Sequence, residues 1–198
     1  NIKFLKKFIF SKKNGKILYI KFERQNLGPI RNDVNAAYDL SSHDLSIFLY
    51  LFKSLPKLNK NSSYSILKKN ISDISNLSFR FKNFYIDINN SWLNPDKIRR
   101  ITIISDKKML LFNEMERENK IKIFNKYAQY PKMSYFDNKF FNKKAKIYLG
   151  KNSSPRVKQN DSLKDEIKYF FNCISNNIQP KTNIQFALKI LKVLKKIN

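Results

Sequence analysis

Residues 76–88 read NLSFRFKNFYIDI and alternate apolar with polar side chains on both sides of Lys82 and Asn83. The apolar members share one face of each half: Leu77, Phe79 and Phe81, then Phe84, Ile86 and Ile88. A period of two is the spacing of a β-strand with one buried face, and a two-residue polar step between such runs is typical of a hairpin turn. The stretch therefore predicts an antiparallel hairpin whose apolar face covers a core.

The rest of the chain adds strands around this hairpin and helices at a distance from it. Strand-like runs recur at 17–24, 99–105, 108–112 and 120–124, and helical spacing of apolar residues occurs at 2–13, 42–53, 162–175 and 183–197. Several strands with short connections favour antiparallel pairing. We therefore expect one α+β domain over residues 1–198, with an open, mostly antiparallel β-sheet and helices packed on one face.

Three local features complete this expectation. The segment 126–161 is polar and rich in Asn and Lys, and it predicts a long surface excursion. Ser41 and Ser42 precede an apolar run, and a serine there is the predicted N-terminal cap of the helix over 42–53. Trp92 follows a strand and is predicted to pack in the core or at an interface, and Cys173, which has apolar neighbours on its helix, is predicted to be a buried thiol.

Composition excludes several kinds of site. The single cysteine excludes an internal disulfide, and with the single histidine, His43, it is too little for a zinc site, so no metal is predicted. The three glycines lie far apart and form no glycine-rich phosphate loop. The longest apolar run, 47–52, is too short to cross a bilayer, so we expect a cytoplasmic protein with no membrane partner.

The charge leaves an alternative function open. The chain carries 40 Lys and Arg against 15 Asp and Glu, a net charge of +25, but only seven of the basic residues are Arg. Lys, Asn, Ile, Phe and Tyr all have AT-rich codons, so genome composition can account for the excess of lysine. Nucleic acid is therefore an unfavoured partner. A lysine-rich nucleic-acid-binding protein of ribosomal type, or a non-catalytic interaction domain, remains the alternative.

One segment carries residues suited to proton transfer. His43 lies near the start of the expected 42–53 helix, where the helix dipole favours neutral imidazole, and Asp39 precedes it by four residues and could orient its ring. The alternative is that both residues only cap the helix. Upstream, Arg31, Asp33 and Asn35 could hold a hydroxyl-rich or anionic ligand, or could form an ordinary polar loop.

Four segments together resemble a known family. Residues 24–51 (RQNLGPIRNDVNAAYDLSSHDLSIFLYL) are similar to the second domain of the glucose–fructose oxidoreductase, inositol dehydrogenase and MocA family, including its Asp-x-x-x-His element at Asp39 to His43. The strand and hairpin at 91–108 and the helices at 162–175 and 183–197 follow in the order of that family.

The resemblance implies a fold, a reaction and roles for residues. The fold would be the glyceraldehyde-3-phosphate dehydrogenase-like, or dihydrodipicolinate reductase-like, C-terminal domain. The reaction would pass hydride between a sugar, nucleotide-sugar or cyclitol hydroxyl and NAD or NADP. By likeness His43 would take the hydroxyl proton, Asp39 would support it, and Arg31 and Asn35 would contact substrate. The domain would form homo-oligomers through its sheet face.

The resemblance also implies a missing part. The family's Rossmann domain, with its glycine-rich turn and Glu-Lys-Pro lysine, has no counterpart here, and the chain begins with Asn1 rather than Met. No residue of this chain is therefore assigned to the cofactor. We expect the chain to be a fragment of a longer enzyme and to be inactive alone.

Overall fold

The computed structural model describes residues 1–130, 144–157 and 161–197. In these ranges the chain forms the helices α1 (Ile2–Phe10), α2 (Ala36–Phe52), α3 (Ser162–Ser175) and α4 (Ile184–Leu194). The strands are β1 (Ile17–Leu27), β2 (Lys57–Tyr64), β3 (Ile74–Phe81), β4 (Phe84–Ser91), β5 (Leu93–Ser105), β6 (Met109–Asn113), β7 (Ile121–Gln129) and β8 (Lys146–Ser153).

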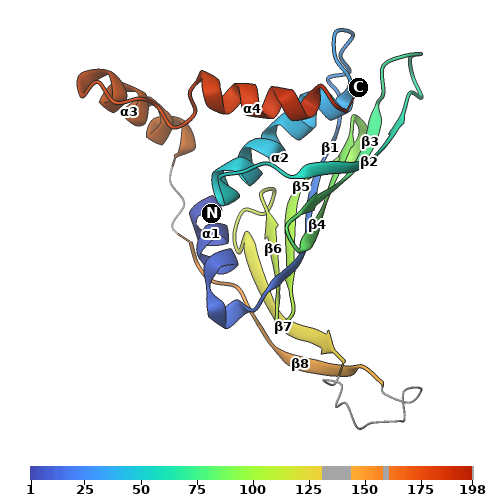
Figure 1. The fold of residues 1–198 in the computed structure, drawn as a ribbon, viewed down its shortest axis with the longest axis vertical. Helices are drawn as coiled ribbons and strands as arrows, with labels where there is room; N and C mark the ends of the chain where they lie inside the picture. Colours follow the sequence, from blue (N-terminus) through green and yellow to red (C-terminus); the bar gives the residue numbers. More distant parts are fainter. Residues whose placement is uncertain (131–143, 158–160, 198) are drawn as a thin grey trace.

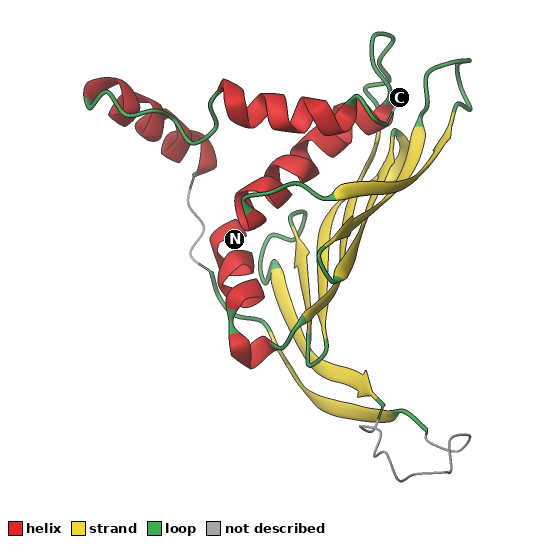
Figure 2. Ribbon diagram, in the orientation of Figure 1, coloured by secondary structure: helices red, strands yellow, loops and turns green. Residues whose placement is uncertain are grey.

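The eight described strands form one open sheet in the order β2-β3-β4-β1-β5-β6-β7-β8. Neighbouring strands are antiparallel except β1 and β4, which run parallel. The chain reverses direction between β4 and β5, and β1 lies between these two strands, so it is antiparallel to β5 and parallel to β4. Helices α1, α2 and α4 lie on one side of the sheet, and the opposite side is bare in Figure 2. The expected α+β class and mostly antiparallel sheet are confirmed.

The hairpin of β3 and β4 supplies the centre of the core, as its alternation predicts. Its six apolar residues are buried, and the turn lies at Lys82 and Asn83. Phe48 of α2 packs edge-on against Phe81, with ring centroids 5.0 Å apart, and stacks on Phe52 at 4.5 Å. Burying one side of the sheet under α2 fixes which face of each strand points inward, because successive side chains alternate between faces.

Helix α2 begins six residues earlier than predicted, and Ser42 is not its cap. Asn35 caps the helix, since its side-chain oxygen accepts a hydrogen bond from Tyr38 N at 2.8 Å. Ser42 lies inside the helix and donates to the carbonyl of Asp39. An asparagine cap followed by two alanines is a strong helix start, and it takes precedence over the later serine.

Two further boundaries differ from the prediction. The segment 126–161 is not irregular throughout, because it contains the end of β7 and all of β8; residues 131–143 and 158–160 of it lie outside the described parts. All eight residues of β8 are exposed, so the strand has no buried face to produce an apolar alternation. The first helix stops at Phe10, and a 3-10 turn continues to Asn14.

Helix α3 matches its predicted range but not its expected packing. It projects away from the sheet (Figure 1), and Cys173 is its one buried residue in the described chain. Its apolar residues are exposed, namely Leu163, Ile167, Phe170, Phe171 and Ile174. The spacing identifies a helix with an apolar face, but it does not specify what that face contacts.

Candidate functional site

His43 is an exposed residue on α2, two turns from the start of the helix. The expected effect of the helix dipole on His43 is therefore wrong, because that effect falls off within the first turn. The side chain lines a cavity of about 1250 Å³ bordered by α1, α2, α4 and the inner side of the sheet. A ligand can therefore reach the imidazole directly.

Asp39 is held by two side chains from outside α2. The indole Nε1 of Trp92 donates to Asp39 Oδ2 at 3.2 Å, and Arg31 Nη1 lies 3.7 Å from Asp39 Oδ1. Trp92 is fully buried, as predicted, and its backbone nitrogen donates to the carbonyl of Asp73. Within the described structure no side-chain hydrogen bond joins the Asp39 carboxylate to the His43 ring, so the carboxylate is anchored to the core rather than to the imidazole.

The polar loop before α2 forms a surface ion pair. Arg31 donates to both oxygens of Asp33, at 3.0 and 2.6 Å, and this hydrogen bonding lowers the pKa of Asp33 and raises that of Arg31. Both side chains are exposed. Asn35 caps α2 by its side-chain oxygen. Of the four candidate residues His43, Asp39, Arg31 and Asn35, only His43 lines the cavity.

An ion pair that the sequence analysis missed lies beside His43. Arg24 of β1 donates its Nε and Nη2 hydrogens to Asp44 Oδ1, at 3.2 and 2.9 Å. Both side chains are nearly buried, and the second oxygen of Asp44 has no hydrogen-bond partner among the described residues. Burial therefore raises the pKa of Asp44, although Arg24 opposes the shift. The pair ties α2 to the sheet next to the exposed imidazole.

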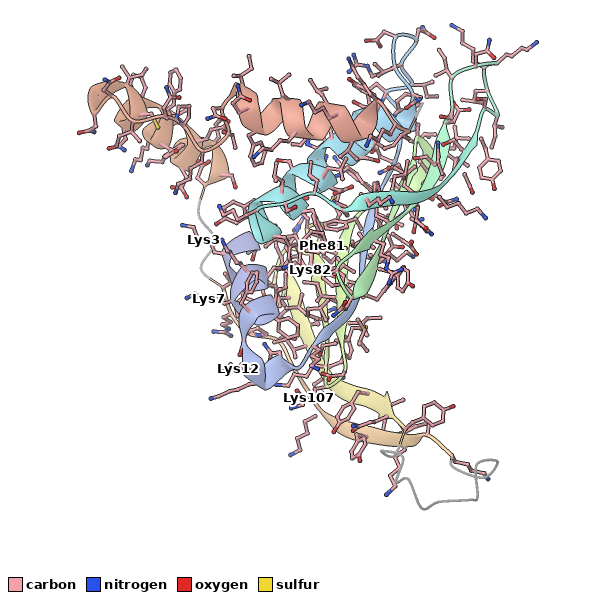
Figure 3. The ribbon with its side chains drawn as sticks, in the orientation of Figure 1. Lys3, Lys7, Lys12, Phe81, Lys82 and Lys107 are labelled. Carbon is pink, nitrogen blue, oxygen red and sulfur yellow. The ribbon has the colours of Figure 1, made fainter. Side chains whose placement is uncertain are left out.

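The cavity wall is strongly basic. Eight Lys or Arg side chains line it against two acidic ones, Glu114 and Asp165. Lys3 and Lys7 of α1 are among them, and Figure 3 shows both on the side of α1 that faces away from the sheet. The cavity can accordingly hold a ligand of substantial size that carries negative charge.

Arg24 and Arg99 are the cavity residues that sequence reasoning could have found. Arg24 continues the alternation of Ile20 and Phe22 on β1, and Arg99 precedes Ile101 and Ile103 at the same spacing on β5. The period of two therefore places both arginines on the inner face of the sheet. Asp44 carried no comparable signal, because its burial depends on contact with Arg24.

Two kinds of feature are not found in the described chain. No group of three or more His, Cys, Asp or Glu side chains there could hold a metal ion. None of the helices in the described ranges has the length and apolar character to cross a membrane.

Comparison by sequence gives no relative, because no protein-family profile and no curated protein matches the chain. Comparison by structure gives several. The chain is similar to the UDP-N-acetylglucosamine 3-dehydrogenase GnnA from Acidithiobacillus ferrooxidans, with a TM-score of 0.65, 16% identity and 92% of this chain covered. It is also similar to the aldose-aldose oxidoreductase from Caulobacter crescentus, with a TM-score of 0.68, 11% identity and 99% covered.

A third similar structure holds two ligands. It is the WlbA dehydrogenase from Bordetella pertussis in complex with NADH and UDP-GlcNAcA, with a TM-score of 0.63, 14% identity and 99% of this chain covered. The chain spans 52%, 55% and 56% of these three proteins in the order given, about half of their length. The described fold is therefore that of one part of these larger oxidoreductases, as the resemblance in sequence implies.

Proposed function

We propose that this chain is the substrate-binding part of an oxidoreductase that moves hydride between a sugar or cyclitol hydroxyl carbon and NAD or NADP. The observation that carries the proposal is the single histidine of the chain, which is exposed on the wall of the large cavity beside α2. The similar fold of GnnA, WlbA and the aldose-aldose oxidoreductase supports the same class of reaction.

His43 is the proposed general base. Its imidazole is accessible from the cavity and can take the proton of a substrate hydroxyl as the carbon is oxidised. Asp39 has a supporting electrostatic role, because Trp92 and Arg31 hold its carboxylate one helical turn before His43. Its negative charge on the same face of α2 stabilises the imidazolium that proton transfer creates.

The cofactor would be bound mainly by another domain. Gly15, Gly28 and Gly150 lie in different parts of the fold and build no dinucleotide loop, whereas the cavity beside His43 has room for the reacting end of a nicotinamide next to a sugar. The nicotinamide, when bound, supplies the acceptor for the hydride. This chain supplies the base and the walls that orient the hydroxyl.

The substrate and the assembly are finer parts of the same proposal. A nucleotide sugar fits the size and basic wall of the cavity. Copies of the chain would associate through the uncovered face of the sheet, where half-exposed Ile104, Met109 and Phe124 lie on adjoining strands. Sedimentation of the purified chain tests this association, and a monomer at all concentrations contradicts it.

The test of the proposed reaction is His43→Ala in the intact enzyme that contains a dinucleotide-binding domain. Loss of a general base lowers kcat by about 10²- to 10⁴-fold with little change in folding, because His43 is exposed. Steady-state kinetics of NAD(P)H formation measure the effect, and Ser42→Ala is the neighbouring control. An unchanged kcat in His43→Ala would show that another group is the base.

A companion assay addresses the chain alone. Without a dinucleotide-binding domain we expect no NAD(P)H formation from any sugar, because this chain has no glycine-rich loop to hold the dinucleotide phosphates. Turnover by the isolated chain would contradict the proposal that another domain binds the cofactor.

A further inference from the structure

Two arginines lie directly opposite each other on the inner face of the sheet. Arg24 of β1 and Arg99 of β5 are partners in the antiparallel register, and both line the His43 cavity. Only seven of the 40 basic residues in the chain are Arg, so the general excess of lysine does not explain this pair. Like charges at opposed positions destabilise a sheet, so the placement is not a means of strand pairing.

The first arginine is held in a fixed orientation. The side chain of Arg24 is 11% exposed, and Asp44 Oδ1 accepts from its Nε and Nη2. Both of these hydrogen bonds go to one carboxylate oxygen, and Nη1 takes no part in them. The buried pair therefore orients the guanidinium at low entropic cost, with further N–H groups left for a ligand.

The second arginine, Arg99, has N–H groups that are not engaged by a carboxylate. Arg99 is 36% exposed, with its nearest carboxylate oxygen, on Glu114, 3.8 Å away. That separation is too long for a hydrogen bond. The Nε of Arg99 is buried and has no hydrogen-bond partner in the described structure. A buried donor without a partner is costly, and because this atom has no exposed surface, the Nη groups of the part-exposed side chain are the donors that remain for a ligand.

The surroundings of the pair fit an oxyanion. Asn26 lies two residues beyond Arg24 on β1 and also lines the cavity; its Nδ2 donates to the carbonyl of Gly28, so one further amide N–H is left for a ligand. The acidic groups that face the pair are Asp44, which is engaged by Arg24 and has a raised pKa, and Glu114. Planar guanidinium groups match carboxylate and phosphate oxygens in pairs, which lysine ammonium groups do not.

We propose that Arg24 and Arg99 form an anion subsite on the floor of the His43 cavity, which binds a carboxylate or phosphate group of the substrate. This inference rests on one part of the proposed function, namely that the reacting sugar lies beside His43. Binding of the anion needs neither the cofactor nor turnover.

The test is titration of the purified chain with inorganic phosphate, sodium glucuronate and, as a neutral control, glucose, followed by NMR. The chain has one histidine, so the His43 ring signal reports occupancy of the cavity without assignment of other residues. We expect saturable shifts of this signal with one or both anions, at concentrations where glucose, which lacks the anionic group, gives a smaller shift or none. A response to glucuronate alone identifies a carboxylate site, and a response to phosphate alone identifies a phosphate site.

Arg99→Gln and Arg100→Gln form a matched pair of variants. Arg100 is the next residue on β5, opposite Glu23 in the register and on the other face of the sheet, and both substitutions remove one positive charge. Arg99→Gln should weaken binding by about tenfold, the loss of one charge-assisted contact, and Arg100→Gln by less than about twofold. Arg99→Lys, which keeps the charge without the planar fork, should fall between wild type and Arg99→Gln.

Two outcomes would overturn the proposal. One is equal weakening by Arg99→Gln and Arg100→Gln, which would mean that net charge alone attracts the anion. The other is the absence of any shift of the His43 signal with either anion. The kinetic effect of His43→Ala is measured separately, so failure of the anion subsite and failure of the proposed reaction can be told apart.

Discussion

The side chain of Asp44 is buried, and only one of its two carboxylate oxygens accepts hydrogen bonds in the described structure. Its Oδ1 accepts from Arg24, its Oδ2 has no hydrogen-bond partner in the part of the chain that the structure describes, and Glu114 adds repulsion. Burial therefore raises the pKa of Asp44 above its ordinary value of 3.8. At the scale of the residue, the folded protein holds the Asp44 proton at pH values where the unfolded chain has released it.

This shift predicts a pH dependence of stability that Asp44→Asn should remove. As pH rises above 3.8, the unfolded chain loses its proton first, so the contribution of Asp44 to the free energy of unfolding falls until the folded carboxyl has also ionised. Urea denaturation of wild type and Asp44→Asn between pH 4 and 7 measures the difference. We expect wild type to lose stability relative to the variant as pH rises.

The variant keeps an oxygen that can accept from Arg24, so it retains the geometry of the pair. If wild type instead gained stability relative to Asp44→Asn with rising pH, attraction to Arg24 would outweigh burial. Asp33 gives the opposite contrast, because Arg31 lowers its pKa and the stability that it contributes is lost as pH falls.

At the scale of the element, α2 is defined by its cap. Asn35→Ala removes the acceptor for Tyr38 N and should lower the free energy of unfolding by about 1 kcal/mol. Ser42→Ala is the control, because Ser42 lies within the helix, and its effect should stay within about 0.5 kcal/mol. Chemical denaturation followed by circular dichroism measures both. A larger loss of stability in Ser42→Ala than in Asn35→Ala would indicate that Ser42, not Asn35, caps the helix.

At the scale of the whole molecule, the burial of two phenylalanines distinguishes the core from the projecting helix α3. Phe48 is 1% exposed and Phe170 is 61% exposed. Phe48→Ala should lower the free energy of unfolding by about 3–5 kcal/mol, and Phe170→Ala by less than about 0.5 kcal/mol. Denaturation curves of the two variants give this comparison directly. A large loss in Phe170→Ala would mean that α3 is packed in the protein in solution.

The sequence predicted the site in part. Alternation identified the central hairpin, and the burial of Trp92 was expected, whereas the choice of His43 as general base stays a prediction, with His43 on the wall of the cavity. The reason given for His43 was wrong, because α2 starts at Ala36 and the helix dipole does not act there. The link from Trp92 to Asp39 spans 53 positions and could not follow from local spacing.

Local patterns by themselves identified the strands β1 and β3 to β7, the turn at Lys82 and Asn83, the range of α3 and the absence of a disulfide, because each depends on neighbouring residues or on a count. Tertiary structure alone decided that β1 pairs parallel to β4, that Arg24 lies opposite Arg99, and that the apolar face of α3 is left uncovered. The two strand pairings join residues far apart in the chain, and the exposure of α3 depends on which distant residues do or do not pack against it. Their free energy comes from long-range burial and hydrogen bonding, which the spacing of a single segment does not record.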